Sequence, residues 1–464
     1  MARPNLLNPK KLIDEIPSPF SRYADIEGTS GIILLFCAIA ALVIANTGLG
    51  HGYHELLETD LIIGFGEFAI EKPLHIWIND GLMAIFFFYV GLEIKREVKV
   101  GELSVLRQAM LPFFAAIGGM VVPAGLFILL QGNQPGSDGW GVPMATDIAF
   151  SLGLLMLLGE RVPTALKVFL TAFAIVDDIG AILVIALYYS NDVQIMSLLY
   201  AGGFYLFLVM CNQLNLRKAW VYSAVGIVIW YFFLRSGVHP TVAGILVALV
   251  IPSNTRIKMT DFVRTTQSAL NHFLDAKRNA VAQFLSKEQL VAISDIEDSS
   301  DKVQPPLQRL ENMLHPYVAF LIMPVFALAN AGVSLHPEEG VALFTPLSVN
   351  ILIGLVAGKA VGIVLFTWLS VQLGLADLPR NSKWVHFVGL GFMGGIGFTM
   401  SLFIANLAFG GQPGQIVPAK LGILLGSAIS GIVGLTILYL TLDKRKAQTL
   451  TEHEDPTSVI DVNN

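Results

Sequence analysis

The chain has 464 residues, of which 54% are hydrophobic and only 14% are charged, and its mean hydropathy is +0.66. A soluble domain of this length carries nearly twice that charged fraction, so the composition excludes an ordinary water-soluble globule and favours lipid as the solvent. The net charge of −6 excludes little, because the placement of charges matters more than their sum in a membrane protein. Cys37 and Cys211 both have apolar neighbours in the sequence, which favours small core residues over a disulfide or a metal-ligand cluster.

Residues 1–27 are polar and contain proline, so we expect a cytoplasmic segment without a cleaved signal. A membrane-spanning helix needs about 20 mostly apolar residues. Taken in order, and with a short eighth member, twelve stretches are predicted to span the membrane: 28–48, 76–98, 107–131, 143–159, 164–190, 194–213, 218–235, 239–252, 313–336, 345–372, 384–409 and 417–441. We therefore predict an all-α polytopic membrane domain over 28–442 and a cytoplasmic tail over 443–464.

Basic residues provide an independent test of this count, because Lys and Arg collect on the cytoplasmic side of membrane proteins. With the N-terminus inside, all but four of the 29 Lys and Arg residues fall in cytoplasmic stretches. Lys72, Arg235 and Lys420 fall outside, and Lys359 lies within a span. Both termini are therefore predicted to be cytoplasmic.

Two stretches between the predicted spans differ from simple loops. Residues 51–75 alternate polar and apolar side chains around Gly64 and Gly66, which favours a small extracytoplasmic β-hairpin over a disordered loop. Residues 254–310 form a long polar insertion that we place in the cytoplasm. It contains a candidate amphipathic helix over 262–285 and an acidic run over 295–301, and we interpret it as a mobile linker.

The strongest functional candidates are Asp177 and Asp178, which lie mid-span between apolar residues. Charge at that depth costs about 2.5–3.5 kcal/mol per residue, so a functional interpretation is the default. Adjacent helix positions point about 100° apart, and both carboxylates can therefore border one cavity. Protons would relieve their mutual repulsion, and so would a small hard cation, which prefers oxygen ligands. A pair that holds either but not both is the core of an exchanger, while a hydrogen-bonded structural pair is the alternative.

Asp147 lies in a span that glycines and a proline interrupt, with the hydroxyl of Thr146 beside it. A broken helix exposes backbone amides and carbonyls that can help to solvate an ion. The alternative is an Asp that caps a helix near the membrane interface. The interrupting residues are Gly132, Gly136, Gly139, Gly141 and Pro143.

Lys359 is also mid-span, and a buried ammonium group needs a carboxylate or a set of carbonyls. We expect its partner to be Asp177, Asp178 or the carbonyl end of a broken helix.

The other ionisable candidates have ordinary alternatives. Asp80 is either a functional residue within the membrane or a residue at the outer interface. Glu93, Arg96 and Glu97 occupy a cytoplasmic helix end, where charges are ordinary. His239 stands at a helix start, where a single histidine is more often structural.

Gly389, Gly391 and Gly394 spell the GxGxxG pattern of dinucleotide-binding loops. The surrounding segment is almost wholly apolar, and no acidic residue follows about twenty positions on, so we reject that interpretation. With Gly395 and Gly397, the glycines favour close helix contacts or a second broken span. Interruptions would then fall in the fourth and eleventh spans, the middle members of two three-helix sets. Corresponding interruptions in two halves are typical of transporter binding sites.

At these motifs the chain resembles the NhaA family of bacterial sodium/proton antiporters, from about Arg22 to Leu442. The resemblance rests on eight segments, which begin Ile78-Asn-Asp-Gly, Val90-Gly-Leu-Glu-Ile-Lys-Arg-Glu, Ala145-Thr-Asp-Ile, Ala174-Ile-Val-Asp-Asp, Ser236-Gly-Val-His, Leu314-His-Pro, Phe326-Ala-Leu-Ala-Asn and Gly395-Ile-Gly-Phe-Thr-Met-Ser. It implies inverted 3+3 repeats with crossing broken helices 4 and 11, in the bacterial inner membrane.

By that resemblance, Asp177 and Asp178 carry Na+, Li+ and protons, and Thr146 lines the cavity. Asp147 and Lys359 would balance the helix-dipole ends at the crossing, with Lys359 also paired to Asp177. The family pattern implies more than one proton per sodium ion and a homodimer joined through residues 51–75. It also implies a pH-responsive cluster of Glu93, Arg96, Glu97, Glu311 and His315, with His239 also implicated. No resident cofactor and no nucleic-acid partner is expected.

This sequence departs from the family pattern at three places: Asn312 stands where a second histidine is expected, Ala360 stands where proline is common, and the insertion 254–310 is long. These departures concern the pH profile rather than transport. Two rival functions remain. A prenyltransferase-type enzyme would need further carboxylates where Ala181 and Ile182 stand. A proton-coupled solute symporter would need a roomier site.

Overall fold

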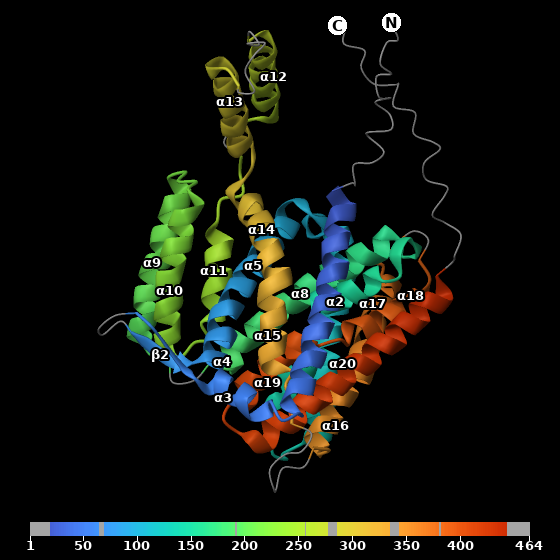
Figure 1. The fold of residues 1–464 in the computed structure, drawn as a ribbon. Helices are drawn as coiled ribbons and strands as arrows, with labels where there is room; N and C mark the ends of the chain where they lie inside the picture. Colours follow the sequence, from blue (N-terminus) through green and yellow to red (C-terminus); the bar gives the residue numbers. More distant parts are fainter. Residues whose placement is uncertain are drawn as a thin grey trace, which may run out of the picture. The chain divides into compact units, whose positions relative to one another are not determined.

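The computed structural model describes residues 19–64, 69–190, 193–255, 257–276, 285–334, 343–379 and 382–442 (Figure 1). These residues are helical apart from one two-stranded sheet and short connections. Most of the predicted N-terminal segment and the whole predicted tail, 443–464, lie outside the described residues. The chain divides into two compact units, which are taken separately below.

The prediction of an all-helical polytopic membrane protein is confirmed. Within the described ranges, 10 helices are long and apolar enough to cross a membrane, or up to 11 if one bent pair counts as a single span. A shorter apolar helix, α11 (Thr241–Val250), coincides with the short eighth stretch of the sequence prediction. All twelve predicted stretches are therefore largely helical, and one of them is too short to count as a span by length.

The first unit comprises Met1–His75, Glu102–Ile185 and Ala319–Asn464. Helices α17, α18 and α20 pack side by side in it (Figure 1). Its elements are α2 (Pro19–Ala45), α3 (Gly50–Glu58), β1 (Asp60–Ile63), β2 (Ile70–Pro73), η3 (Glu102–Ser104), α6 (Leu106–Gln131), η4 (Ser137–Met144), α7 (Ile148–Met156), η5 (Gly159–Arg161), most of α8 (Thr164–Tyr188), α15 (Met323–Asn330), α16 (Pro346–Ile353), η7 (Gly354–Gly358), α17 (Lys359–Gln372), α18 (Trp384–Gly394), α19 (Phe398–Phe409) and α20 (Pro413–Thr441).

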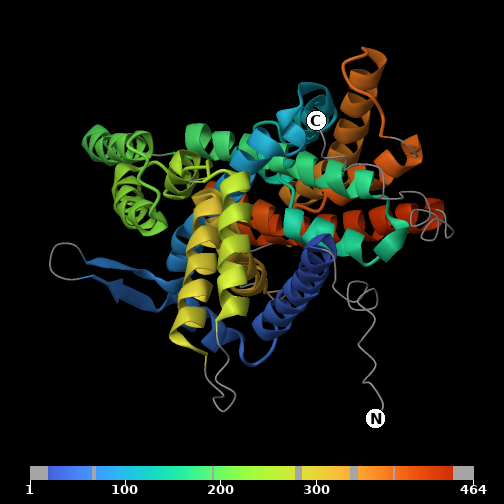
Figure 2. The same ribbon diagram turned by 90° about the horizontal axis from the view of Figure 1, so that it is seen from above.

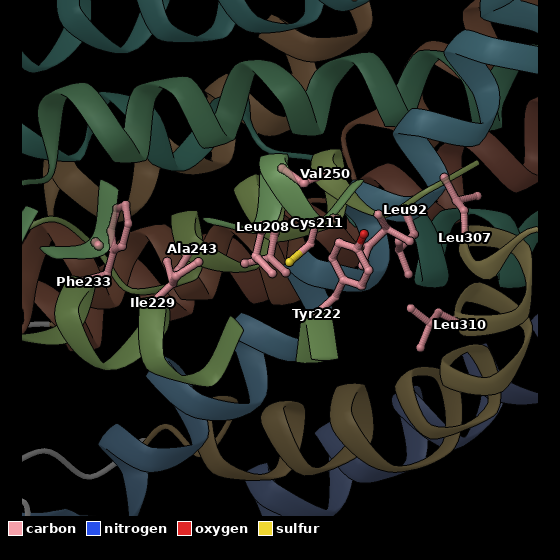
Figure 3. Packing of buried hydrophobic residues seen from close by; sticks show 14 residues of the cluster. Leu92, Leu208, Cys211, Tyr222, Ile229, Phe233, Ala243, Val250, Leu307 and Leu310 are labelled. Atoms are coloured by element: carbon pink, nitrogen blue, oxygen red, sulfur yellow. The ribbon is translucent and has the colours of Figure 1, made fainter. Parts of the chain in front are cut away.

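The second unit comprises Ile76–Gly101 and Ala186–Val318. Its core includes Leu92, Leu208, Tyr222 and Val250, and the buried Cys211 packs with them, as expected for a small core residue (Figure 3). The elements of this unit are η2 (Trp77–Leu82), α5 (Met83–Val100), α9 (Ile195–Gln213), α10 (Ala219–Ser236), α11, α12 (Met259–Asp275), α13 (Lys287–Val303) and α14 (Pro306–Tyr317). Two short elements, α4 (Leu74–Ile76) and η6 (Val318–Ile322), lie at the boundaries between the units.

The predicted hairpin is confirmed, but it is shorter than residues 51–75. Strands β1 and β2 pair antiparallel, with Asp60 opposite Pro73 and Ile63 opposite Ile70 (Figure 2). The turn around Gly66 lies outside the described residues. The first part of the stretch forms helix α3, whose Tyr53 hydroxyl donates to the Leu328 carbonyl at 2.7 Å. Burial raises the pKa of Tyr53 to about 12, so the phenol remains a hydrogen-bond donor at neutral pH.

The insertion 254–310 was interpreted as a mobile linker with one candidate helix over 262–285, and the described part of it forms two helices, α12 and α13. Helix α13 covers the acidic run 295–301 and packs against α12 (Figure 1). The Ser286 hydroxyl accepts from the Gln289 amide, and the Gln289 side chain accepts from the Ser286 amide, which caps the start of α13. Ala269 and Ala292 are buried, one in each helix of this pair. The local cap and the small buried side chains favour a helical hairpin despite the acidic composition.

Helices α6 and α17 cross closely in the first unit. Gly354, Gly358 and Gly362 follow one another at intervals of four residues, so they lie on one helix face. A Cβ atom on Gly362 would overlap the Gly118 carbonyl of α6, and one on Gly118 would overlap the Gly362 carbonyl. Small residues that allow such backbone approach are typical of membrane helix interfaces. This close crossing places the start of α17, and with it Lys359, deep inside the unit.

Candidate cation and proton site

The fourth span is broken, as its glycines and proline predict. The 3-10 helix η4 ends at Met144, Ala145 is extended, and α7 begins at Ile148. Asp147 is the N-cap of α7, because its Oδ1 accepts from the Phe150 amide at 3.0 Å. The capping alternative is therefore correct in part, but Asp147 is 0% exposed. The cap lies in the protein interior rather than at a surface.

The eleventh span is broken as well. Helices α18 and α19 are bent by 43° at Gly395-Ile396-Gly397. A Cβ atom on Gly395 would overlap the Leu355 carbonyl, and one on Gly397 would overlap the Ser401 hydroxyl. These contacts explain the glycines that the sequence pattern singled out. Ser427 of α20 accepts from the Phe398 amide at 3.1 Å and so satisfies one free N–H at the start of α19.

The two breaks contact each other directly. The Asp147 amide donates to the Ile396 carbonyl at 2.7 Å, and the Thr146 hydroxyl donates to the Gly394 carbonyl at 2.8 Å. In return, the amide and the hydroxyl of Thr399 both donate to Oδ2 of Asp147, the amide at 3.1 Å. Extended backbone at this depth is tolerated only where such partners replace water. The crossing is thus a hydrogen-bonded unit of backbone and side-chain groups.

Asp147 lies at the N-terminal ends of two helices. Its Oδ1 accepts from the first turn of α7, and its Oδ2 accepts from the first turn of α19. The N-terminus of a helix carries a partial positive charge, so two such ends stabilise a buried carboxylate. Asp147 therefore lies against the partial positive charges of two helix starts.

The paired aspartates lie in α8, and Lys359 reaches one of them. The Lys359 ammonium donates to Oδ2 of Asp177 at 2.7 Å, and these two side chains are 0% and 1% exposed. Asp178 is buried beside them and also attracts the Lys359 charge. The ring centroid of Phe173 lies 5.5 Å from the same ammonium nitrogen. Of the three partners left open by the sequence, the structure selects Asp177.

Oxygen atoms suited to a small cation are present at this pair. Oδ1 of Asp177 is buried and accepts no hydrogen bond in the structure. Asp178 and Thr146 are also buried and bear oxygen atoms. Na+ and Li+ prefer such hard oxygen ligands. Among the described residues, no cluster of three or more His, Cys, Asp or Glu is placed to hold a metal ion.

Four of the predicted pH-responsive residues meet in the second unit, namely Glu93, Arg96, Glu97 and Glu311. Arg96 contacts Glu97 at 2.5 Å and Glu311 at 2.7 Å, and its distance to Glu93 is 3.9 Å. The three carboxylates are buried, which the ordinary-surface interpretation of this helix end did not anticipate. The His315 ring lies 5.9 Å from that of Tyr89 on α5. Asn312, the departure from the family pattern, is exposed.

Asp80 and His239 form a second polar pair in this unit. His239 Nε2 lies 3.5 Å from Oδ1 of Asp80, and the ring Nδ1 lies 2.7 Å from the Thr241 hydroxyl. Asp80 belongs to the π-helical turn η2, and its carbonyl accepts from Trp230 at 3.3 Å. The sequence alone does not indicate this pair, because Asp80 and His239 are far apart in the chain.

Sequence reasoning missed two residues of the site. Thr399 lies in the glycine-containing motif 395–401, and the sequence predicted no role for it. In the structure it donates two hydrogen bonds to Asp147. Phe173 precedes Asp177 by one helical turn, and nothing in its apolar context distinguished it from a core residue. A hydroxyl just after a predicted helix break was the only usable signal for Thr399.

Broken helices that cross beside a buried carboxylate pair and a buried lysine define an ion-coupled membrane transporter. Residues 21–438 match the family model described as Na+/H+ antiporter 1. The chain belongs to this family, so it is a transporter and not an enzyme, and the prenyltransferase alternative is excluded.

Curated relatives support the assignment along almost the whole chain. The Na(+)/H(+) antiporter NhaA of Oleidesulfovibrio alaskensis is 47% identical over 94% of this chain and 97% of its own length. The Na(+)/H(+) antiporter NhaA 1 of Saccharophagus degradans is 44% identical over 95% of each chain. A solved structure of the sodium proton antiporter MjNhaP1 from Methanocaldococcus jannaschii is 12% identical over 89% of this chain and 92% of its own, with a TM-score of 0.46.

Proposed function

We propose that this chain exchanges cytoplasmic Na+ or Li+ for external protons, and that the cation and the protons compete for Asp177 and Asp178. The observation that carries this proposal is the fully buried pair of Lys359 and Asp177 beside the crossing of two broken spans. Buried ionisable groups of this kind mark ion and proton pathways in membrane proteins.

Competition follows from the chemistry of two adjacent carboxylates. When both are ionised they repel each other, and either a cation or protons can relieve that repulsion. Their titration is shared, so the protons leave in two steps that belong to the pair rather than to either residue. A hard alkali ion would bind Oδ1 of Asp177, the Asp178 carboxylate and the Thr146 hydroxyl, and protonation would remove the negative charge that holds it.

Lys359 makes the exchange sensitive to both the cation and the protons. Its ammonium occupies Oδ2 of Asp177, so a cation that binds this carboxylate must weaken the ion pair. The balancing charges at the crossing, Asp147 and Lys359, keep the buried region near neutrality while the load at Asp177 and Asp178 changes. We propose that more than one proton enters for each sodium ion that leaves, which makes transport electrogenic and responsive to membrane potential.

Alternating access at the crossing would expose the pair to one side of the membrane at a time. We further propose that the ion-pair cluster of Arg96, Glu93, Glu97 and Glu311, with His315 and His239, adjusts the rate to pH. We also propose that two copies of the chain form a homodimer through the β1–β2 hairpin. The protein would lie in the bacterial inner membrane with both termini in the cytoplasm.

Replacement of Asp178 tests the proposal. We expect Asp178→Asn to abolish Na+- and Li+-dependent proton movement in everted vesicles, because the amide cannot bind a proton or supply a carboxylate charge. Asp377→Asn is the matched control, since Asp377 is exposed and pairs with the exposed Arg107. The control should retain exchange at near wild-type rates.

Two results would reject the assignment: sodium-dependent proton flux in membrane-inserted Asp178→Asn protein, or binding of Na+ to purified protein at alkaline pH without proton release. A proton-coupled symporter is distinguished in the same vesicles by adding Na+, Li+, K+ and candidate solutes in turn. The symporter requires a response to a solute, and the antiporter requires a response to Na+ or Li+.

A further inference from the structure

We propose that Phe173 is a positioning residue that holds the Lys359 ammonium when a transported cation occupies Asp177. The inference rests on the proposed competition at Asp177 and goes beyond it by assigning the place to which the lysine moves. Phe173 is 1% exposed, and its ring centroid lies 5.5 Å from the Lys359 nitrogen, within the range of a cation–π interaction.

The position of the ring is set by its neighbours on two other helices. A Cβ atom on Gly394 of α18 would lie 3.1 Å from the Phe173 ring, and one on Gly119 of α6 would lie 3.3 Å from it. Glycine at both positions gives the ring its space, while the two backbones limit its movement. The ring is also stacked on Phe169, one turn earlier in α8, with 6.4 Å between centroids. The π face is therefore held in place near the lysine.

The need for such a face follows from the charges around Lys359. Asp177 is its hydrogen-bonded partner, and Asp178 is the other carboxylate that attracts it. A monovalent cation bound at these two acids offsets one of the two negative charges that stabilise the ammonium, and it displaces the ammonium from Asp177. A buried ammonium without a carboxylate is strongly unfavourable. Of the side chains described here, Phe173 offers an aromatic quadrupole to the same nitrogen.

The ring contributes more to the sodium-bound state than to the sodium-free state. While Asp177 pairs with Lys359, the carboxylate already neutralises most of the ammonium field at the ring. Once Na+ or Li+ takes the Asp177 carboxylate, the ammonium loses its hydrogen-bonded counter-charge, and the attraction of the ring for it strengthens at this buried position. Phe173 would thus favour cation binding without touching the cation.

Fluorinated phenylalanines at position 173 test this role, because fluorine withdraws electron density from the ring face with little change of shape. We expect the apparent Km for Na+ to rise stepwise from mono- to trifluorophenylalanine, by about three- to thirtyfold in total. The maximal exchange rate should change less than twofold. Phe173→Leu, which removes the π face altogether, should reach at least the same Km.

The same series at Phe169 is the control, since Phe169 is buried, stacks on Phe173 and meets Phe387 edge to face, but has no cation–π contact with Lys359 among the described residues. Its Km should stay within twofold of the wild type. An unchanged Km across the series at 173, with Asp178→Asn still inactive, would overturn this inference and leave the proposed function standing. A parallel loss of maximal rate at 173 and 169 would indicate a packing role only.

Discussion

At the scale of single residues, the site is organised by which atoms each charge contacts. Asp147 accepts from the starts of two helices, and Asp177 pairs with Lys359, although all three side chains are buried. A buried charge is tolerated when its partners have good geometry and is strongly destabilising when one partner is removed. Residues that supply these partners should therefore matter as much as the charges themselves.

Thr399 provides a test at this scale. We expect Thr399→Val to reduce stability by about 1.5–3 kcal/mol, because a buried carboxylate loses one hydroxyl donor while the volume hardly changes. The exchange rate should fall as well, since the start of α19 is less firmly held at the crossing. Unfolding of purified protein in detergent and proton flux in vesicles measure the two effects.

Thr367→Val is the matched control for this experiment. Thr367 is also 0% exposed, but its hydroxyl donates to the Ile363 carbonyl of its own helix rather than to a carboxylate. The substitution should cost less than about 1.5 kcal/mol and leave exchange intact. Equal effects of the two substitutions would argue against a special contribution of Thr399.

At the scale of elements, polar side chains connect helices that are distant from one another in the sequence. Arg96 of α5 pairs with Glu311 of α14, and Lys95 donates to the Leu249 carbonyl at 2.6 Å near the end of α11. The breaks in spans 4 and 11 are joined in a similar way, by hydroxyls and backbone groups rather than by apolar contact. Polar contacts of this kind have defined geometry, so a change of charge can shift one helix relative to its neighbour.

The cluster at the α5–α14 contact gives a prediction about pH dependence. Replacing Arg96 with Gln leaves the buried carboxylates Glu93, Glu97 and Glu311 without their common counter-charge. Because their mutual repulsion is then uncompensated, we expect the pH profile of exchange to shift towards alkaline values by about one unit. Proton flux at fixed Na+ over a pH series measures the shift.

Arg107→Gln serves as the control, because Arg107 and Asp377 form an exposed ion pair, which contributes little to stability or titration of other groups. Its pH profile should superimpose on that of the wild type. A profile of Arg96→Gln that differs only in height would contradict a pH-responsive role and favour a structural one.

At the scale of the whole molecule, the chain passes several times between two compact units. The candidate ion site lies within one unit, and the Arg96 cluster lies within the other. The β1–β2 hairpin belongs to the unit that holds the site, and its strand β1 exposes Leu61, Ile62 and Ile63. Exposed apolar edge strands readily pair with another chain. This surface supports the proposal that the hairpin joins two copies of the protein.

Deletion of residues 60–73 with a short Gly/Ser replacement tests the assembly. We expect cross-linking and native mass spectrometry in detergent to change from dimer to monomer, and we expect exchange to persist, because the residues of the ion site lie elsewhere in the chain. Substitution of Leu61, Ile62 and Ile63 by serine should weaken the dimer with the backbone intact. A dimer that survives both changes would place the interface elsewhere.

The sequence by itself determined the membrane-spanning character, the positions of the apolar spans and the identity of the ionisable residues. These properties depend on local composition, because burial in lipid is read from about 20 residues at a time. The breaks near Asp147 and Gly395 were predictable for the same reason, since glycine and proline act on their own backbone.

Only the tertiary structure decided which groups meet. It selected Asp177 rather than Asp178 as the partner of Lys359, brought Thr399 to Asp147 and turned the acidic part of the insertion into α13. The first two outcomes depend on residues far apart in the chain, whose approach is set by close helix packing at positions such as Gly118 and Gly362, whereas α13 depends on its packing against α12. Hydrophobic patterning determines that a helix is buried, but the direction and partner of a buried charge follow from geometry that no local window contains.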